Sequence, residues 1–140
     1  MGKILCATRG GEASYCAQDA AIALAKERGD TLLFLYVVDL HFLDKTGGSI
    51  VVDVGNEVAK MGRFLLLMAK ERAAEQGVEA ETTSRKGVFR EELKDAACEE
   101  GVSLVVLGRP VGEESVFKLA GLQTFAAEIE AETGVETVIV

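Results

Sequence analysis

Short, almost wholly apolar segments alternate with helical patterns along this chain, and this alternation limits the possible folds most strongly. The segments at 3–8 (KILCAT), 31–38 (TLLFLYVV) and 104–107 (LVVL) are apolar nearly throughout, as strands buried on both faces are. A more polar strand is expected at 78–84, and a last strand begins at Val135 and ends at Val140. Strands that alternate with helices form parallel sheets joined by right-handed crossovers. We therefore predict an α/β fold with a five-stranded parallel sheet in three α/β/α layers.

Four helices are expected between these strands. They are predicted at 12–28, from 50–53 to about 76, at 89–100 and at 121–133. The long second helix carries apolar residues at alternating four- and three-residue steps, as a helix with one buried face does. These residues are Val54, Val58, Met61, Leu65 and Met68. We expect this stripe, both methionines included, to pack in the core.

Length and composition favour a single domain over residues 1–140 in the cytoplasm. Apolar residues make up 49% of the chain, yet no apolar run approaches the roughly 20 residues of a membrane span. The first residues (MGKILCATRGG) form no hydrophobic signal segment. We therefore expect no membrane partner.

Charge and cysteine content exclude further classes of function. The 15 Lys and Arg residues against 23 Asp and Glu give a net charge of −8, which disfavours nucleic acid as a partner. The three cysteines, Cys6, Cys16 and Cys98, include no CxxC pair, so reduced and mostly buried thiols are expected. His41 is the only histidine and has no Cys or Glu cluster near it, so we predict neither a metal site nor a catalytic triad.

The stretch after the 104–107 strand is the first candidate for a ligand site. It contains Gly108, Arg109, Gly112 and Gly121 and leads into the last predicted helix. A glycine-rich loop between a buried strand and a helix lets backbone N–H groups approach a phosphate, and the helix end adds partial positive charge. Glycines also serve strand–helix connections that only need tight turns, and this simpler interpretation stays open.

The topology adds a second loop to this site. In open parallel sheets, ligands bind beyond the carboxyl ends of the strands where the strand order reverses. This rule nominates the loops at 7–11 and 108–121. Arg9 and Arg109 would then lie at the ligand end, either as an anion clamp or as solvated side chains.

Across the whole chain the sequence resembles the universal stress protein family. ILCATRGGEAS resembles the opening strand of that family, and YVVD at 36–39 resembles the end of its second strand. VEAETTSRKG, EELKDAACEEGVSLVVLG and the closing apolar strand match in order and spacing. The resemblance implies a Rossmann-like fold and a homodimer through the strand from Val135 to Val140. Such an apolar edge benefits from pairing.

The resemblance is incomplete at the nucleotide site. Members that bind ATP carry G-x2-G-x9-G-[ST] after the fourth strand. Gly108 and Gly121 keep the outer spacing, whereas the middle glycine lies one position late, at Gly112. Leu122 replaces the final hydroxyl residue, and Arg9 replaces an Asp that faces the adenosine in the family.

The resemblance thus implies a candidate nucleotide or anion pocket. Its residues would be Ala7, Thr8, Arg9, Val37, Gly108, Arg109, Gly112, Gly121 and Leu122. Val37 would flank the base, and the loop glycines would face the phosphates. Each lost polar contact costs on the order of 1–3 kcal/mol, so three departures from the motif could abolish micromolar binding.

Three functions follow from these observations. We expect a dimeric regulatory domain of universal stress type, acting on an unknown protein partner, whose degenerate pocket binds ATP weakly or not at all. The alternative is an adenine-nucleotide (ATP or AMP) binding protein that uses the 108–121 loop with Arg9 and Arg109, and Mg²⁺ where the ligand is ATP. A slow nucleotide hydrolase comes third, because no general base, nucleophile pair or metal-ligand cluster supports an enzyme.

Overall fold

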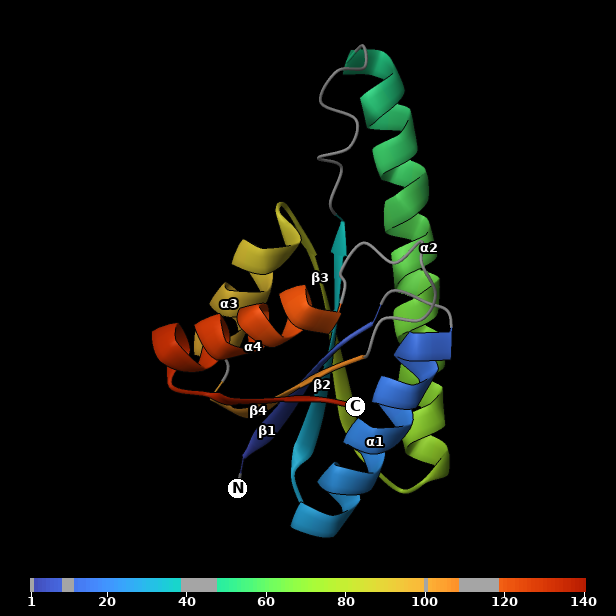
Figure 1. Ribbon diagram of the computed structural model, residues 1–140. Coiled ribbons are helices and arrows are strands. Elements are labelled where there is room, and N and C mark those ends of the chain that lie inside the picture. Colours follow the sequence, from blue (N-terminus) through green and yellow to red (C-terminus); the bar gives the residue numbers. More distant parts are fainter. Residues whose placement is uncertain (1, 9–11, 39–47, 100, 109–118) are drawn as a thin grey trace.

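The computed structural model describes residues 2–8, 12–38, 48–99, 101–108 and 119–140 (Figure 1). Within these residues, strands and helices alternate from one end to the other. In chain order they are β1 (Lys3–Ala7), α1 (Glu12–Arg28), β2 (Thr31–Val38), α2 (Gly48–Glu75), β3 (Ala80–Lys86), α3 (Phe89–Glu99), β4 (Val102–Leu107), α4 (Leu119–Thr133) and β5 (Glu136–Ile139). The alternation predicted from the apolar segments is confirmed.

The five strands form one parallel sheet in the order β3-β2-β1-β4-β5. β1 lies in the middle, where Leu5 pairs with Leu33 of β2 on one side and with Val105 of β4 on the other. Along the chain, β2 and β3 add to one side of β1, and β4 and β5 then add to its other side. The strand order therefore reverses between β1 and β4, the place where ligands bind in sheets of this kind.

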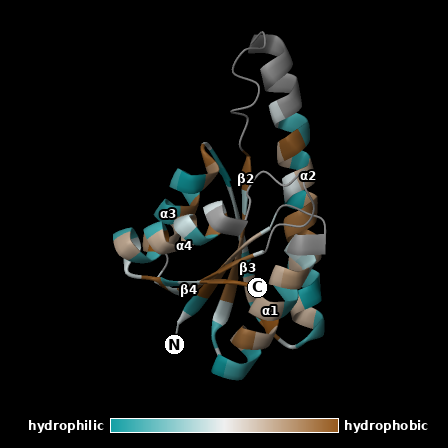
Figure 2. Cartoon of the chain, in the orientation of Figure 1, coloured by the Kyte–Doolittle hydropathy of each residue, from teal (hydrophilic) through white to brown (hydrophobic). Residues whose placement is uncertain are grey.

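Helices cover both faces of the sheet, which confirms the predicted three layers. α1 and α2 lie on one face, and α3 and α4 lie on the other (Figure 1). Successive side chains of β1 alternate between the two cores, with Ile4 and Cys6 on the α1/α2 side and Leu5 on the α3/α4 side. The central strands β1, β2 and β4 are rich in apolar residues, whereas β3 at one edge of the sheet is polar (Figure 2). Among the helices of the described residues, none combines the length and apolarity needed to cross a bilayer.

The element boundaries follow local backbone chemistry. α1 and α2 are each followed by a glycine with positive φ, 69° at Gly29 and 75° at Gly77, a conformation that ends helices and that glycine adopts without strain. β3 runs further than the predicted 78–84 because it pairs with β2 as far as Val38 and Lys86.

The buried face of α2 is turned slightly from the face that its apolar spacing predicted. Val58 and Leu65 pack against the core as expected, and the side chain of Val54 lies outside the described residues. Leu66, Ala69 and Ala73 are buried, whereas the side chain of Met61 is 59% exposed and Met68 is only partly buried. The expectation that Met61 packs in the core is therefore wrong.

Gly62 explains this difference. A Cβ atom added at Gly62 would lie 2.3 Å from Cδ1 of Tyr36 on β2, closer than two non-bonded carbon atoms can approach. The missing side chain lets α2 lie directly against β2, and Ala69 and Ala73 continue this close contact along the helix. Small residues, rather than the methionines, thus decide which face of α2 turns inward.

The substitution Gly62→Ala should destabilise the protein, since overpacking against Tyr36 costs about 1–3 kcal/mol or more. This cost exceeds the gain of about 1 kcal/mol that alanine brings to a helix. Gly121→Ala in α4 is the matched control, because a Cβ there would meet no described atom within 4 Å. Urea unfolding should give changes of opposite sign for the two variants. Equal changes would contradict the role assigned to Gly62.

Candidate functional site

The predicted site residues that the structure describes lie at the carboxyl end of the sheet. Ala7 is the last residue of β1 and Thr8 follows it, while Gly108 follows the last residue of β4. Cys6 pairs with Val106, so the chain leaves the sheet at Thr8 and at Gly108 from neighbouring strands. The predicted residues that fall outside the described residues are Arg9, Arg109 and Gly112.

Val37 lies near the end of β2, on the other side of β1. It stands two residues beyond Leu35, which is the partner of Ala7. β2 therefore extends past the end of β1, and Val37 lies beside the point where the chain leaves that strand. Its side chain is buried and packs in the core under α3 and α4.

The last two predicted site residues, Gly121 and Leu122, lie at the start of α4 in different environments. Leu122 is only 4% exposed and packs with Phe125 and Ile129 in the core on the α3/α4 side. Gly121 is half-buried, and a Cβ added there would meet no atom of the described residues within 4 Å. Position 121 therefore has room for a methyl group, whereas position 122 offers an inward apolar side chain in place of a hydroxyl.

Thr8 begins a chain of hydrogen bonds that the sequence analysis missed. Its hydroxyl Oγ1 accepts a hydrogen bond of 2.7 Å from Nε2 of Gln18 on α1. The Oε1 atom of Gln18 in turn accepts one of 2.7 Å from Nη1 of Arg72 on α2. Thr8 and Gln18 are 1% and 2% exposed, so these are buried polar groups that satisfy one another. No motif joins positions 8, 18 and 72, and only the fold brings them together.

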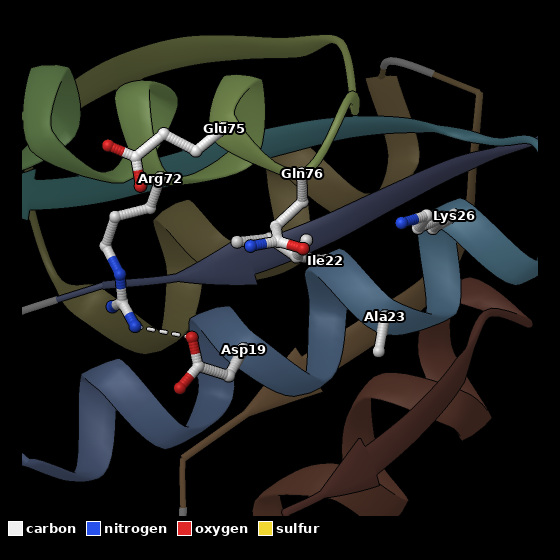
Figure 3. A pocket seen from close by; sticks show the side chains of 7 residues that line it. All are labelled: Asp19, Ile22, Ala23, Lys26, Arg72, Glu75 and Gln76. Carbon is white, nitrogen blue, oxygen red and sulfur yellow. Dashed lines mark hydrogen bonds and ion pairs between the residues drawn. The ribbon is translucent and has the colours of Figure 1, made fainter.

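Two further side chains of α1, Asp19 and Tyr15, contact Arg72. Its Nη2 atom bonds the carboxylate of Asp19, and Figure 3 shows the side chain reaching from α2 across to this residue of α1. Its Cζ atom lies 5.0 Å from the centre of the Tyr15 ring, a cation–π distance. A planar guanidinium with several donors suits this role. Arg72 therefore holds α1 and α2 together beside the end of β1.

The same arginine lines a cleft of about 390 Å³ between α1 and α2 (Figure 3). Its lining residues are Asp19, Ile22, Ala23, Lys26, Arg72, Glu75 and Gln76. Two basic and two acidic side chains balance one another, so this cleft has no marked preference for anions or cations. None of the predicted site residues lines it.

A second cleft, of about 230 Å³, lies where β2 and β3 end beside α2. It is lined by Val38, Gly55, Asn56, Ala59, Ser84, Arg85 and Lys86. Nη1 of Arg85 lies 3.5 Å from Oε1 of Glu92 on α3, and this carboxylate offsets part of the positive charge of the cleft. This cleft also contains none of the predicted site residues.

Lys94 joins α3 to α4 through two carboxylates of α4. A hydrogen bond with Glu132 raises the pKa of Lys94, whose Nζ lies 2.6 Å from Glu132 and 3.4 Å from Glu128, so it links α3 to α4 as a cation. Among the residues that the structure describes, no group of three or more His, Cys, Asp or Glu side chains could hold a metal ion.

The three thiols lie in two environments. Cys6 is buried in β1, and this burial raises the pKa of its thiol to about 12. Cys16 on α1 and Cys98 on α3 are exposed, so the expectation of mostly buried thiols is wrong. Both exposed cysteines lie on the outward faces of their helices.

A parallel sheet whose order reverses at β1, with two neighbouring strands ending in Thr8 and Gly108, defines a doubly wound α/β protein with a ligand end. The family model described as the universal stress protein family matches residues 1–115. The universal stress protein YxiE of Bacillus subtilis (strain 168) is 38% identical over 124 residues, which cover 77% of this chain and 78% of that protein. The chain therefore belongs to the universal stress protein family.

Solved structures agree with this assignment. A universal stress family protein from Burkholderia pseudomallei has a TM-score of 0.74 at 27% identity, over 99% of this chain and 95% of that one. The universal stress protein of Archaeoglobus fulgidus in complex with dAMP has a TM-score of 0.66 at 15% identity, over 99% and 96% of the two chains. At that identity the second likeness establishes the fold.

Removing the side-chain amide of Gln18, which links Thr8 to Arg72, should destabilise the protein. Gln18→Ala leaves Thr8 and Arg72 without this partner, and an unsatisfied buried polar group costs about 1–3 kcal/mol. In a double-mutant cycle with Thr8→Val, the two changes should be non-additive. Asp19→Ala serves as a control at the exposed end of the network and should cost less than about 1 kcal/mol. Equal losses of unfolding free energy for Gln18→Ala and Asp19→Ala would contradict the buried network.

Thiol titration should separate the cysteines. At pH 8 a thiol with a pKa near 12 is protonated and unreactive, so Cys6 should react with a thiol reagent only after unfolding. The exposed Cys16 and Cys98 should react in the native protein. Labelling followed by peptide mass spectrometry assigns each site, and native labelling at Cys6 would contradict the fold around β1.

Proposed function

We propose that this protein is a dimeric, non-enzymatic regulatory domain of universal stress type, working in the cytoplasm with a protein partner, whose nucleotide pocket is degenerate and binds ATP weakly or not at all. The observation that carries this proposal is the burial of Leu122. The position that supplies a hydroxyl in the ATP-binding motif belongs here to the hydrophobic core.

The packing of Leu122 opposes a simple rearrangement toward a phosphate. Its side chain lies with Phe125 and Ile129 in the core, and exposing a buried leucine costs about 1.5–3 kcal/mol. Even an exposed leucine would donate no hydrogen bond. A bound phosphate would then depend on backbone N–H groups and on Arg9 and Arg109.

The edge position of β5 supports the proposed homodimer. Among the described strands β5 pairs only with β4, so its other edge faces away from the sheet. The N–H of Thr137 on that strand donates to Oε1 of Glu130 at 2.9 Å, which protects one edge amide of the single chain. A second copy pairing along the strand from Val135 to Val140 would exchange this contact for strand pairing.

An adenine-nucleotide binding protein is the second candidate, and the room at Gly121 within the described residues favours it. A ligand phosphate could approach that backbone, together with Gly108 and the loop between them. The Archaeoglobus fulgidus relative in complex with dAMP supports an adenine nucleotide as the ligand class. ATP or AMP would be the ligand, with Mg²⁺ accompanying ATP.

Calorimetry and mass spectrometry test the proposal together. Denaturing the purified protein should release no stoichiometric nucleotide, and ATP with Mg²⁺ or AMP should give no saturable heat below about 1 mM, an affinity near −4 kcal/mol. Stoichiometric release of AMP or ATP, or a micromolar dissociation constant, would overturn the degenerate pocket.

Gly121→Ala decides whether any binding uses the predicted pocket. The variant should keep its fold, because an added Cβ meets no atom within 4 Å in the part of the chain that the structure describes. If nucleotide binds at the 108–121 loop, the new methyl group should weaken binding by about tenfold, the equivalent of 1.4 kcal/mol. Arg9→Ala and Arg109→Ala should weaken it as well. Unchanged affinity in all three variants would place the ligand elsewhere.

A further inference from the structure

The outer face of α2 carries large apolar side chains that the core does not use. Met61, Phe64 and Leu67 are 59%, 63% and 55% exposed. They recur at three-residue steps and so lie along one side of the helix. That side is opposite to the one on which Gly62, Leu66 and Ala69 face the sheet. Three adjacent side chains of this size on one exposed helix face are typical of an interaction surface.

Charged residues border this face in a specific arrangement. Lys60 stands one turn before Phe64, and Glu71 stands one turn after Leu67; both are exposed. Positions 60, 64, 67 and 71 are symmetric about the midpoint between residues 65 and 66. At a rise of 1.5 Å per residue, Lys60 and Glu71 each lie about 8 Å from this point along the helix axis. The face is thus apolar in the middle, with Lys60 and its neighbour Glu57 at one end and Glu71 at the other.

We propose that this face binds the α2 helix of a second copy of the chain, with the two helices antiparallel. A two-fold axis at the midpoint would place Lys60 opposite Glu71 of the second copy, and Phe64 opposite Leu67. Each contact occurs twice, as in any isologous interface. The charge order favours this occupant, because antiparallel pairing about this midpoint brings unlike charges together at both ends. The 3.7 Å contact between Lys60 and Glu57 is an exposed pair and competes weakly.

The packing of α2 leaves this surface available alongside the β5 edge. α2 covers β2 and β3, in one half of the sheet, whereas β5 forms the edge of the other half. The two surfaces can therefore act independently, and self-association through α2 does not rest on the proposed strand pairing.

Light scattering after size exclusion tests the proposal on the full chain at tens of micromolar. Phe64→Glu and Leu67→Glu should each halve the molar mass relative to wild type, whether the wild type is a dimer or a tetramer. Val88→Glu, at another exposed apolar residue, is the matched control and should leave the mass unchanged. Circular dichroism should report an unchanged fold, since both replaced side chains are mostly exposed. Equal masses for wild type and both α2 variants would overturn the proposal.

Charge reversal tests the antiparallel register. Lys60→Glu and Glu71→Lys should each weaken self-association by about tenfold, because the two-fold axis makes each change act twice. The double variant restores unlike pairs and should return to within about twofold of wild type. A double variant that associates no better than the single variants would overturn the register and with it this pairing of two α2 helices.

Discussion

The pairing of β1 on both sides is the constraint on which the rest of this structure depends. β2 and β4 both pair with it, so the sheet order reverses there and the ends at Thr8 and Gly108 lie on neighbouring strands. The same pairing sends side chains of β1 alternately into two cores, one under α1 and α2 and the other under α3 and α4. The ligand end of the sheet and the two hydrophobic cores thus have a common origin.

Much of this arrangement could be predicted from the sequence, because strands buried on both faces leave continuous apolar segments such as TLLFLYVV. The rotation of α2 could not. Its apolar spacing fits more than one face, and the contact of Gly62 with Tyr36 selects the face with small residues. The apolar periodicity shows only where apolar residues recur, whereas close packing of a helix on a sheet also depends on the size of their side chains.

Strand ends and loop glycines give the position of the candidate site in the sequence, since these depend on topology, but they give little of its content. The buried contacts of Thr8 with Gln18 and of Gln18 with Arg72 join residues far apart in sequence, and no local pattern announces them. Leu122 departs from the family motif in the sequence, and the structure adds that its side chain belongs to the core. Together these features describe a universal stress protein with a buried polar network beside the end of β1 and an apolar, inward side chain at position 122.

Amide chemical shifts during a titration with ATP and Mg²⁺ test this account most directly. The amides of Thr8, Gly108 and Gly121 report on the end of β1, the end of β4 and the start of α4. A degenerate pocket predicts that these three signals stay unchanged, or move without saturation, up to about 1 mM nucleotide. Saturable shifts of all three with a micromolar midpoint would contradict it and establish a working nucleotide site.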